Sequence, residues 1–223
     1  MRALLSRLRD LLRLIATGHA GEMWRTVRHR VYSNTASLGL RRDLTVMFPA
    51  PKAKLPVQVR PLASGEALAF LDVGRPGLSD SQVYDRLAQQ RLLRSGIRTC
   101  HIALDPSGKP CYMQWLIDPS ENDRVRAFFG SLYPRLGPDE ALLEGAYTPD
   151  EYRGQGIMAS AMAQIAERGR ERGARWVITF VDESNPASLK GCERAGFTPY
   201  VRRHERFRLF QRHITFTPLL PPP

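Results

Sequence analysis

The sequence has few of the residues that form disulfides or bind metals. Its three cysteines, Cys100, Cys111 and Cys192, are odd in number and irregularly spaced, which excludes a disulfide framework. The five histidines are scattered, and no group of histidine, cysteine and carboxylate residues has the spacing of metal ligands. We therefore expect a protein of a reducing compartment that uses no metal.

Long apolar runs are missing as well. No segment of the sequence approaches the roughly 20 apolar residues that cross a bilayer as a helix. Residues 1–20 do not have the pattern of a secretory signal, because Arg7, Arg9, Asp10 and Arg13 interrupt their apolar stretch. These absences predict a cytoplasmic protein.

Acidic residues are scarce only near the two ends of the chain. The formal net charge is +11, with +8 in residues 1–56, −1 in residues 57–200 and +4 in residues 201–223. A nucleic-acid enzyme usually places positive charge around its own cleft, so the neutral central segment argues against a nucleic-acid partner. The basic ends favour contact with an anionic membrane surface or an acidic partner.

Residues 1–56 are predicted to form a basic, helical N-terminal extension. Six apolar residues between Leu4 and Ile15 fall on one helical face, and a second helix is expected over about residues 22–32. Residues 33–56 are expected to be extended and irregular, because prolines end any helix there. Two interpretations of the apolar face stay open. It lies on the inner face of the membrane, giving weak anionic contact through residues 1–50, or it packs on protein, including a second copy in a homodimer.

Residues 57–211 carry the features of a compact α/β domain. Alternating and continuous apolar runs predict strands near residues 57–60, 99–104, 111–117, 142–148 and 176–181, with helices between several of them. Residues 200–216 indicate one or two antiparallel strands, and residues 212–223 contain the end of a strand followed by a proline-rich tail. We place the domain boundaries accordingly, after residues 56 and 211.

The segment from Leu142 to Gly156 predicts a strand, a short loop and the start of a long helix. Such a helix start leaves backbone N–H groups free and carries partial positive charge, and a pyrophosphate can accept hydrogen bonds from these groups. Glycines allow close backbone approach, and Arg153 adds a donor fork suited to phosphate oxygens. Gly154-x-Gly156-x-x-Ala159 followed by Asp182 also fits a nicotinamide dinucleotide site. Against that alternative, five residues separate the strand from the first glycine, and few βα units follow.

Two motifs in this region resemble the GNAT superfamily of acyl-CoA N-acyltransferases. Arg153-x-x-Gly156-x-Met158 is similar to its pyrophosphate loop, and Asn185-x-x-Ser188 followed by Ala195-Gly196-Phe197 is similar to its second signature. The resemblance covers roughly residues 57–211. It implies a mixed, mostly antiparallel central sheet with splayed central strands and flanking helices. Two positions depart from the family pattern: Met158 stands where Gly or Ala is usual, and Cys192 where many relatives have tyrosine.

The resemblance also implies the chemistry. The protein would move an acetyl or other acyl group from acetyl-CoA or another acyl-CoA to a primary amine of a small molecule or a protein, by direct attack in a ternary complex. Glu144 is the expected general base, and Cys192 is a candidate proton donor or simply a small core residue. A CoA-binding sensor or scaffold with little turnover is the alternative. The expected contacts to the coenzyme come from Ala146, Tyr147, Thr148, Arg153, Gly154, Gln155, Gly156, Ile157, Met158, Asn185 and Ser188.

Overall fold

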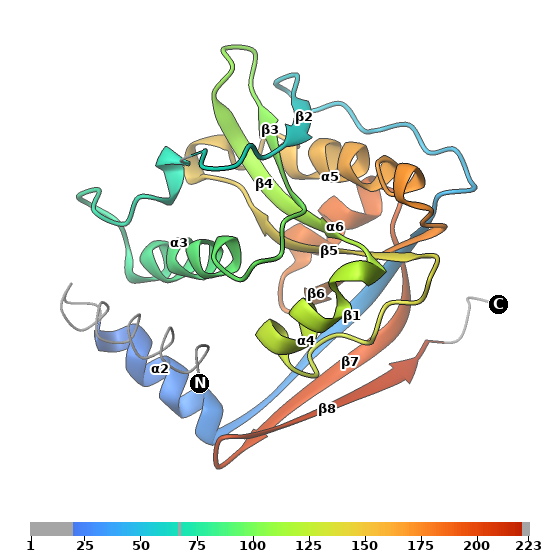
Figure 1. Cartoon of the computed structure of the whole chain (residues 1–223). Helices are drawn as coiled ribbons and strands as arrows, with labels where there is room; N and C mark the ends of the chain where they lie inside the picture. The colour runs from blue at the N-terminus through green and yellow to red at the C-terminus, as the bar shows by residue number, and fades with distance from the viewer. Residues whose placement is uncertain (1–19, 67, 220–223) are drawn as a thin grey trace.

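The computed structural model describes residues 20–66 and 68–219, and the apolar helix expected near the start of the chain lies outside them (Figure 1). The α-helices are α2 (Ala20–Val31), α3 (Asp80–Leu93), α4 (Asn122–Phe129), α5 (Ile157–Glu167) and α6 (Pro186–Arg194). The strands are β1 (Tyr32–Asp43), β2 (Gln58–Pro61), β3 (Cys100–Leu104), β4 (Pro110–Ile117), β5 (Glu140–Tyr147), β6 (Trp176–Asp182), β7 (Thr198–Arg208) and β8 (Gln211–Pro218). Short 3₁₀ turns cover Ala69–Leu71, Pro119–Glu121, Asp150–Tyr152 and Arg170–Arg172.

All eight strands form one sheet in the order β2-β3-β4-β5-β6-β1-β7-β8. Among the described strands, β5 and β6 are the one parallel pair, and every other neighbouring pair is antiparallel. The expected mixed, mostly antiparallel sheet with flanking helices is therefore confirmed. A doubly wound parallel sheet, which the nicotinamide alternative requires, is excluded.

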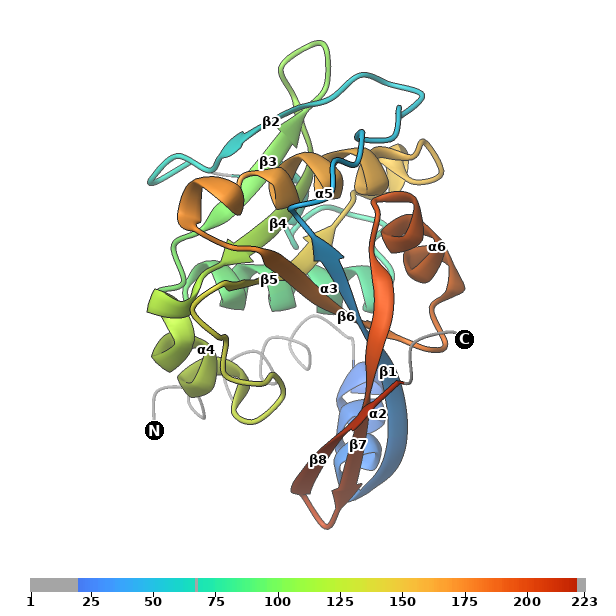
Figure 2. The same ribbon diagram turned by 90° about the vertical axis from the view of Figure 1, so that its right-hand side faces the viewer.

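Helices cover both faces of the sheet. Figures 1 and 2 show α3 and α4 on one face and α5 and α6 on the other. β6 contributes Ile178 and Phe180 to the core on the α3/α4 side and Val177 and Val181 to the core on the α5/α6 side. This two-sided burial explains why residues 176–181 are almost entirely apolar.

The N-terminal segment differs from the sequence-based expectation. Residues 33–56 were expected to be irregular, but β1 occupies the sheet between β6 and β7 and pairs antiparallel with both. The same sheet therefore crosses the boundary placed after residue 56, and β8 carries it past residue 211. The sequence pattern did not predict β1, because only Leu38 and Leu40 alternate as apolar residues in a strand otherwise rich in small and polar side chains.

A buried arginine fixes β1 to the helices behind it. The Arg42 side chain is 2% exposed. Its guanidinium donates hydrogen bonds to the carbonyls of Ala163 in α5 at 3.3 Å and Ala195 after α6 at 3.2 Å, and it pairs with Glu167. Burial lowers the pKa of Arg42, while Glu167 raises it, so the charge is held by its partners. Removing the Glu167 carboxylate would leave a buried charge uncompensated.

The first half of β1 extends beyond β6 and forms an arm with β7 and β8. Tyr32–Ala36 pair with β7 alone, and Figure 2 shows α2 lying along this arm. Leu209 and Phe210 at the β7–β8 turn are 77% and 61% exposed, and their backbone N–H groups bond the last turn of α2. Among the described residues, no helix is long and apolar enough to span a membrane.

The insertion of β1 predicts a steric requirement at Gly39. A Cβ at this position would lie 2.8 Å from Phe180 Cε1 and against Val201 Cγ1. We expect Gly39→Ala to lower the free energy of unfolding by about 1–3 kcal/mol, because overpacking forces neighbouring strands apart. Urea denaturation measures the change. Gly137→Ala is the matched control, since its Cβ would meet nothing closer than 3.4 Å. Equal stability of the two variants would contradict the placement of β1.

Candidate active site

Strands β5 and β6 separate soon after they begin. They pair from Glu140↔Trp176 to Leu142↔Ile178, and then diverge although both strands continue. We call the diverging segments, residues 143–147 and 179–182, the fork. Beyond Leu142 the facing backbone groups of the fork have no strand partner within the described part of the chain. The splayed central strands expected from the sequence are therefore present.

A β-bulge opens the fork. The register between β4 and β5 shifts between Met113↔Tyr147 and Trp115↔Glu144, so Gly145 and Ala146 form the bulge. Gly145 has φ +69°, and a Cβ there would lie 2.7–2.8 Å from atoms of Leu92 and Trp115. Both the backbone conformation and the packing therefore require glycine at this position.

The loop before α5 presents free backbone donors. Gly156, the N-cap of α5, has φ +76° and provides no side-chain cap. Across the residues that the structure describes, no acceptor is found for the N–H groups of residues 154–159, while Ser160 N bonds Gly156 O at 3.2 Å. These N–H groups and the helix dipole suit a phosphate or pyrophosphate.

The Arg153 side chain folds back on its own loop. Its Nε bonds Thr148 O at 3.2 Å, and its Nη1 lies 2.7 Å from Asp150 Oδ1. Asp150 also accepts a hydrogen bond from Gln82, which belongs to the capping box that starts α3. The loop is thus tied to α3 through Asp150, and the half-exposed Arg153 remains beside the free N–H groups.

Two residues that reach this loop were not identified from the sequence. The Arg194 guanidinium lies 3.6 Å from the position that a Gly156 Cβ would occupy. From the other side, the segment after β1 reaches the loop, where Lys54 N bonds Gln155 O at 2.8 Å. Arg194 directly precedes Ala195-Gly196-Phe197, so its nearness to the second motif was the available signal. Nothing in the sequence indicated the contact of Lys54, because only the fold brings it to a loop about a hundred residues away.

The second motif and the Met158 departure are explained by helix packing. Asn185 Oδ1 accepts the N–H of Ser188 at 3.0 Å, which caps α6. Met158 packs across α5 and α6, with its sulfur 3.2 Å from where a Gly191 Cβ would lie. The larger residue on α5 is thus accommodated by a glycine on α6. Ile157 is 1% exposed and belongs to the core.

Glu144 lies in the fork beside a buried tyrosine and a buried arginine. The Tyr133 hydroxyl lies within interaction range of the Glu144 carboxylate and of the Arg203 guanidinium. The guanidinium of Arg203 stacks 5.0 Å from the ring of Phe180 on β6 and bonds Ser37 Oγ at 2.9 Å. Burial raises the pKa of Glu144, while the bond from Tyr133 and the charge of Arg203 oppose this increase. Sequence patterns gave no sign of Tyr133 or Arg203, because both come from elements remote from β5.

The remaining residues expected on β5 divide between the surface and the core. Ala146 is exposed and Thr148 is half-buried, whereas Tyr147 is buried and stacks on Phe70 at 5.6 Å. Burial raises the pKa of Tyr147, and a bond from Arg86 opposes the increase. Ala146 and Thr148 can therefore offer backbone groups to a ligand, while the Tyr147 side chain supports the fork.

Cys192 does not lie with Glu144. Its side chain is fully buried in the core on the α5/α6 side, 3.8 Å from the sulfur of Met162. The contacts of Glu144 with Tyr133 and Arg203 belong to the opposite face of the sheet. Burial raises the pKa of the Cys192 thiol to about 12. These surroundings favour the interpretation of Cys192 as a small core residue.

Asp182 is engaged in its own turn. Its Oδ1 accepts the N–H of Ser184 at 2.8 Å and the hydroxyl of Ser184 at 2.6 Å. Such a carboxylate ends the strand and organises the following loop. Because its hydrogen bonds are made within this turn, Asp182 does not indicate a ribose-binding site. In the described part of the chain, no group of three or more His, Cys, Asp or Glu residues has the arrangement of a metal site.

Comparison with known proteins points to one family. A model of the acetyltransferase (GNAT) family matches residues 84–197, about half of the chain. No curated protein matches the sequence. A GCN5-related N-acetyltransferase from Sphaerobacter thermophilus is similar in structure, with 17% identity over 83% of this chain and 56% of that chain and a TM-score of 0.48.

Other solved structures show the same similarity of fold. An acetyltransferase of the GNAT family from Colwellia psychrerythraea shares 14% identity over 86% of this chain and 59% of its own, with a TM-score of 0.49. The glucosamine N-acetyltransferase region of a fungal multi-domain GH3 beta-N-acetylglucosaminidase shares 13% identity over 85% of this chain and 22% of that chain, with a TM-score of 0.50. The chain thus spans less than two thirds of each of these proteins. At these identities the similarity concerns the fold alone.

The cysteine environments predict an unreactive native protein. Cys100, Cys111 and Cys192 are all buried, and burial raises their pKa values to about 12, 11 and 12. We expect no thiol to react with Ellman's reagent at pH 8 until denaturant is added, when three react, because the thiolate is the reactive form. A native thiol that reacts within seconds would contradict these placements.

Proposed function

Because the chain belongs to the GNAT family of acetyltransferases, we propose that it transfers an acetyl or other acyl group from acyl-CoA to a primary amine by direct attack in a ternary complex. The observation that carries the proposal is the fork. Its strand β5 carries Glu144, a half-buried carboxylate with a raised pKa, and then continues into the loop whose backbone N–H groups are free. The Glu144 carboxylate suits deprotonation of an amine, and the N–H groups of the loop suit a pyrophosphate.

The family uses acetyl-CoA as a co-substrate, and the residues present here fit it. The free donors of residues 154–159 and the adjacent guanidinium groups of Arg153 and Arg194 provide the charge and hydrogen bonds for a pyrophosphate. Asn185 and Ser188, whose helix cap lies at the end of β6, are the proposed contacts to the rest of the coenzyme. When bound, the coenzyme supplies the acyl thioester.

Glu144 is the proposed general base. An alkylammonium group must lose a proton before its nitrogen can attack, and a carboxylate with a raised pKa accepts that proton more readily than an ordinary one. The backbone N–H groups of the bulge at Ala146, Tyr147 and Thr148 are the proposed donors to the thioester oxygen. In the balanced reaction the nitrogen–carbon bond forms and the carbon–sulfur bond breaks. The ammonium nitrogen loses two protons: the first passes to Glu144 and from there to solvent, and the second, lost after the attack, is matched by the proton that the sulfur gains. We assign Cys192 no part in this step.

A CoA-binding sensor with little turnover is the second candidate function. Cys192, at the position where many relatives have tyrosine, is buried in the core and away from the fork. If proton transfer to sulfur has no dedicated residue, binding without efficient transfer follows. The Glu144 experiment below separates this candidate from the enzyme.

The N-terminal contact with an anionic membrane surface, and the homodimer, also remain hypotheses. β1 takes residues 32–43 into the sheet, so a surface role would fall to the residues before it and to residues 45–50, which are exposed. A salt-sensitive loss of anionic vesicle binding on removal of residues 1–19 would support the membrane hypothesis, because surface attraction of basic residues is screened by salt.

Replacing Glu144 by Gln tests the base. We expect Glu144→Gln to lower kcat for acyl transfer by about 10²–10⁴-fold, the usual contribution of a general base. Thiol release from acetyl-CoA over a panel of primary amines measures it. The wild-type rate should fall as pH decreases through the raised pKa of Glu144, and this acid limb should vanish in the variant.

Stability provides the control for this variant. A carboxyl pKa that is higher in the folded than in the unfolded state favours folding at low pH, and that benefit is lost as pH rises through the folded pKa. Glu144→Gln should therefore be no less stable than the wild type at neutral pH. An unchanged rate in a folded variant would overturn the role of Glu144. Tight coenzyme binding with no turnover in the wild type would favour the sensor.

Coenzyme binding depends on the loop and its arginines. We expect Arg194→Ala to weaken acetyl-CoA binding by about 10-fold, since a charge-assisted hydrogen bond contributes roughly 1.5–3 kcal/mol. Arg153→Ala combined with Gly156→Glu should abolish binding, because it adds repulsive charge at the free donors. Calorimetric titration measures both. The control Arg175→Ala, which breaks an ion pair with Asp43 at the other end of β6, should bind normally. Wild-type affinity in the double variant would refute the loop assignment.

A further inference from the structure

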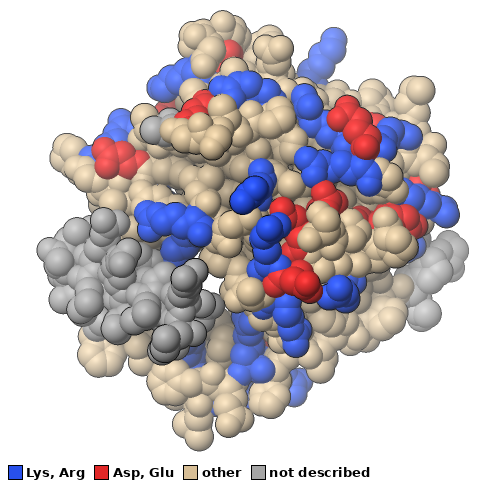
Figure 3. Space-filling view, viewed as in Figure 1, with Lys and Arg blue, Asp and Glu red and all other residues tan. Residues whose placement is uncertain are grey.

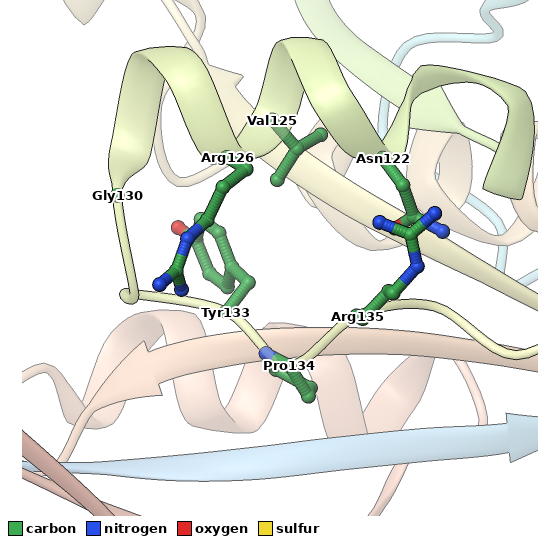
Figure 4. A pocket seen from close by; sticks show the side chains of 7 residues that line it. All are labelled: Asn122, Val125, Arg126, Gly130, Tyr133, Pro134 and Arg135. Atoms are coloured by element: carbon green, nitrogen blue, oxygen red, sulfur yellow. The ribbon is translucent and has the colours of Figure 1, made fainter.

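A cavity next to the Glu144 cluster is lined by arginines. It has a volume of about 180 Å³ and lies between α4 and the loop that follows it (Figure 4). Arg126 reaches into this space from α4 and Arg135 from the loop, and Tyr133 forms part of the wall between them. The full lining is Asn122, Val125, Arg126, Gly130, Tyr133, Pro134 and Arg135.

The positive charge of this cavity is poorly compensated. None of the described residues that line it is acidic. Arg126 has no hydrogen-bond or ion-pair partner for its side chain among residues 20–66 and 68–219. Arg135 meets Asp123 at 3.2 Å, but these side chains are 74% and 91% exposed, and such surface pairs contribute little. Figure 3 shows basic and acidic side chains intermixed near the middle of this face.

The polar group of Asn122 is already used by the protein. Its Nδ2 donates to Leu136 O at 3.0 Å, and its Oδ1 accepts Leu136 N at 2.9 Å. Asn122 therefore holds the loop against α4 and keeps the cavity walls in place. The guanidinium groups are the groups left to bind a ligand.

The wall formed by Tyr133 connects the cavity to the candidate base. Its hydroxyl contacts both Glu144 and Arg203. Arg203 is 8% exposed, and its Nε has no hydrogen-bond partner among the described atoms. An acceptor ammonium approaching Glu144 thus also meets a buried guanidinium. That repulsion is offset when the acceptor carries a negative charge of its own.

We propose that the acceptor is an amine that also carries a carboxylate, with its carboxylate in the cavity between Arg126 and Arg135 and its amine directed to Glu144. Guanidinium groups match the planar carboxylate through paired hydrogen bonds, and the small cavity admits a group of that size. This inference rests on the proposed acyltransferase function and names the class of its substrate.

Matched pairs of amines test the inference. Acetyl-CoA is supplied with 4-aminobutyrate or butylamine, whose amines have similar basicity, and with a series of shorter, longer and α-amino acids beside uncharged amines of equal length. Thiol release gives kcat/KM, and product mass identifies the acetylated amine. We expect at least one carboxylated amine to be favoured by about 10–100-fold over its uncharged match, the value of about one charge-assisted hydrogen bond.

Substitutions then locate the preference. In Arg126→Gln the ratio of kcat/KM for the favoured acid to that for its uncharged match should fall about 10-fold, mainly through KM, and Arg135→Gln should act in the same direction. Arg124→Ala is the control on the same helix. Arg124 pairs with Glu121 at 2.8 Å, is 49% exposed and does not line the cavity. The ratio of the two kcat/KM values in Arg124→Ala should therefore equal that of the wild type.

The outcomes separate this inference from the proposed function. Acyl transfer with no preference for carboxylated amines, or with a preference for phosphoethanolamine over every amino acid, overturns the inference and leaves the acyltransferase in place. Titration of the protein–CoA complex with the same pairs needs no turnover. Selective binding of carboxylated amines that Arg126→Gln removes supports the cavity even if transfer fails. Absence of selective binding across the panel overturns it.

Discussion

The site depends on the early end of pairing between two parallel strands. β5 and β6 share hydrogen bonds only as far as Leu142 and Ile178, because the bulge at Gly145 turns β5 away. The bulge exists only because glycine tolerates both the positive φ and the contacts with Trp115 and Leu92. A fully paired sheet would occupy the backbone groups of the fork and close the space in which Glu144 and Phe180 diverge.

The ionisable groups around the fork come from elements far apart in the sequence. Glu144 comes from β5, Tyr133 from the loop after α4 and Arg203 from β7. Each is costly to bury alone, and each reduces the cost of the others. This balance leaves the carboxyl with a raised pKa and the guanidinium with an open donor. Such a combination suits proton transfer from a ligand that brings charges of both signs.

The N-terminal segment contributes to the site at two places, the sheet and the loop before α5. β1 fills the sheet between β6 and β7, where Arg42 attaches it to α5 and α6. The chain then crosses to the loop before α5, where Lys54 N bonds Gln155 O. A segment that the charge distribution sets apart from the central domain is therefore part of its sheet and part of the proposed coenzyme site.

The sequence by itself determined the elements whose signals are local. The apolar run of β6, the helix α5 and the glycine loop with Arg153 follow from periodicity, burial and backbone geometry over a few residues. The family resemblance added the fork and the role expected for Glu144. Tertiary structure alone decided the rest. β1 has too little alternation to be detected, and its place depends on partners more than a hundred residues away. Tyr133, Arg203 and Arg194 are ordinary residues in the sequence, and their importance arises from contacts that only folding creates. Cys192 shows the converse: the motif resemblance made it a candidate proton donor, but its side chain lies in the core, and the environment of a side chain, not its place in a motif, sets its chemistry.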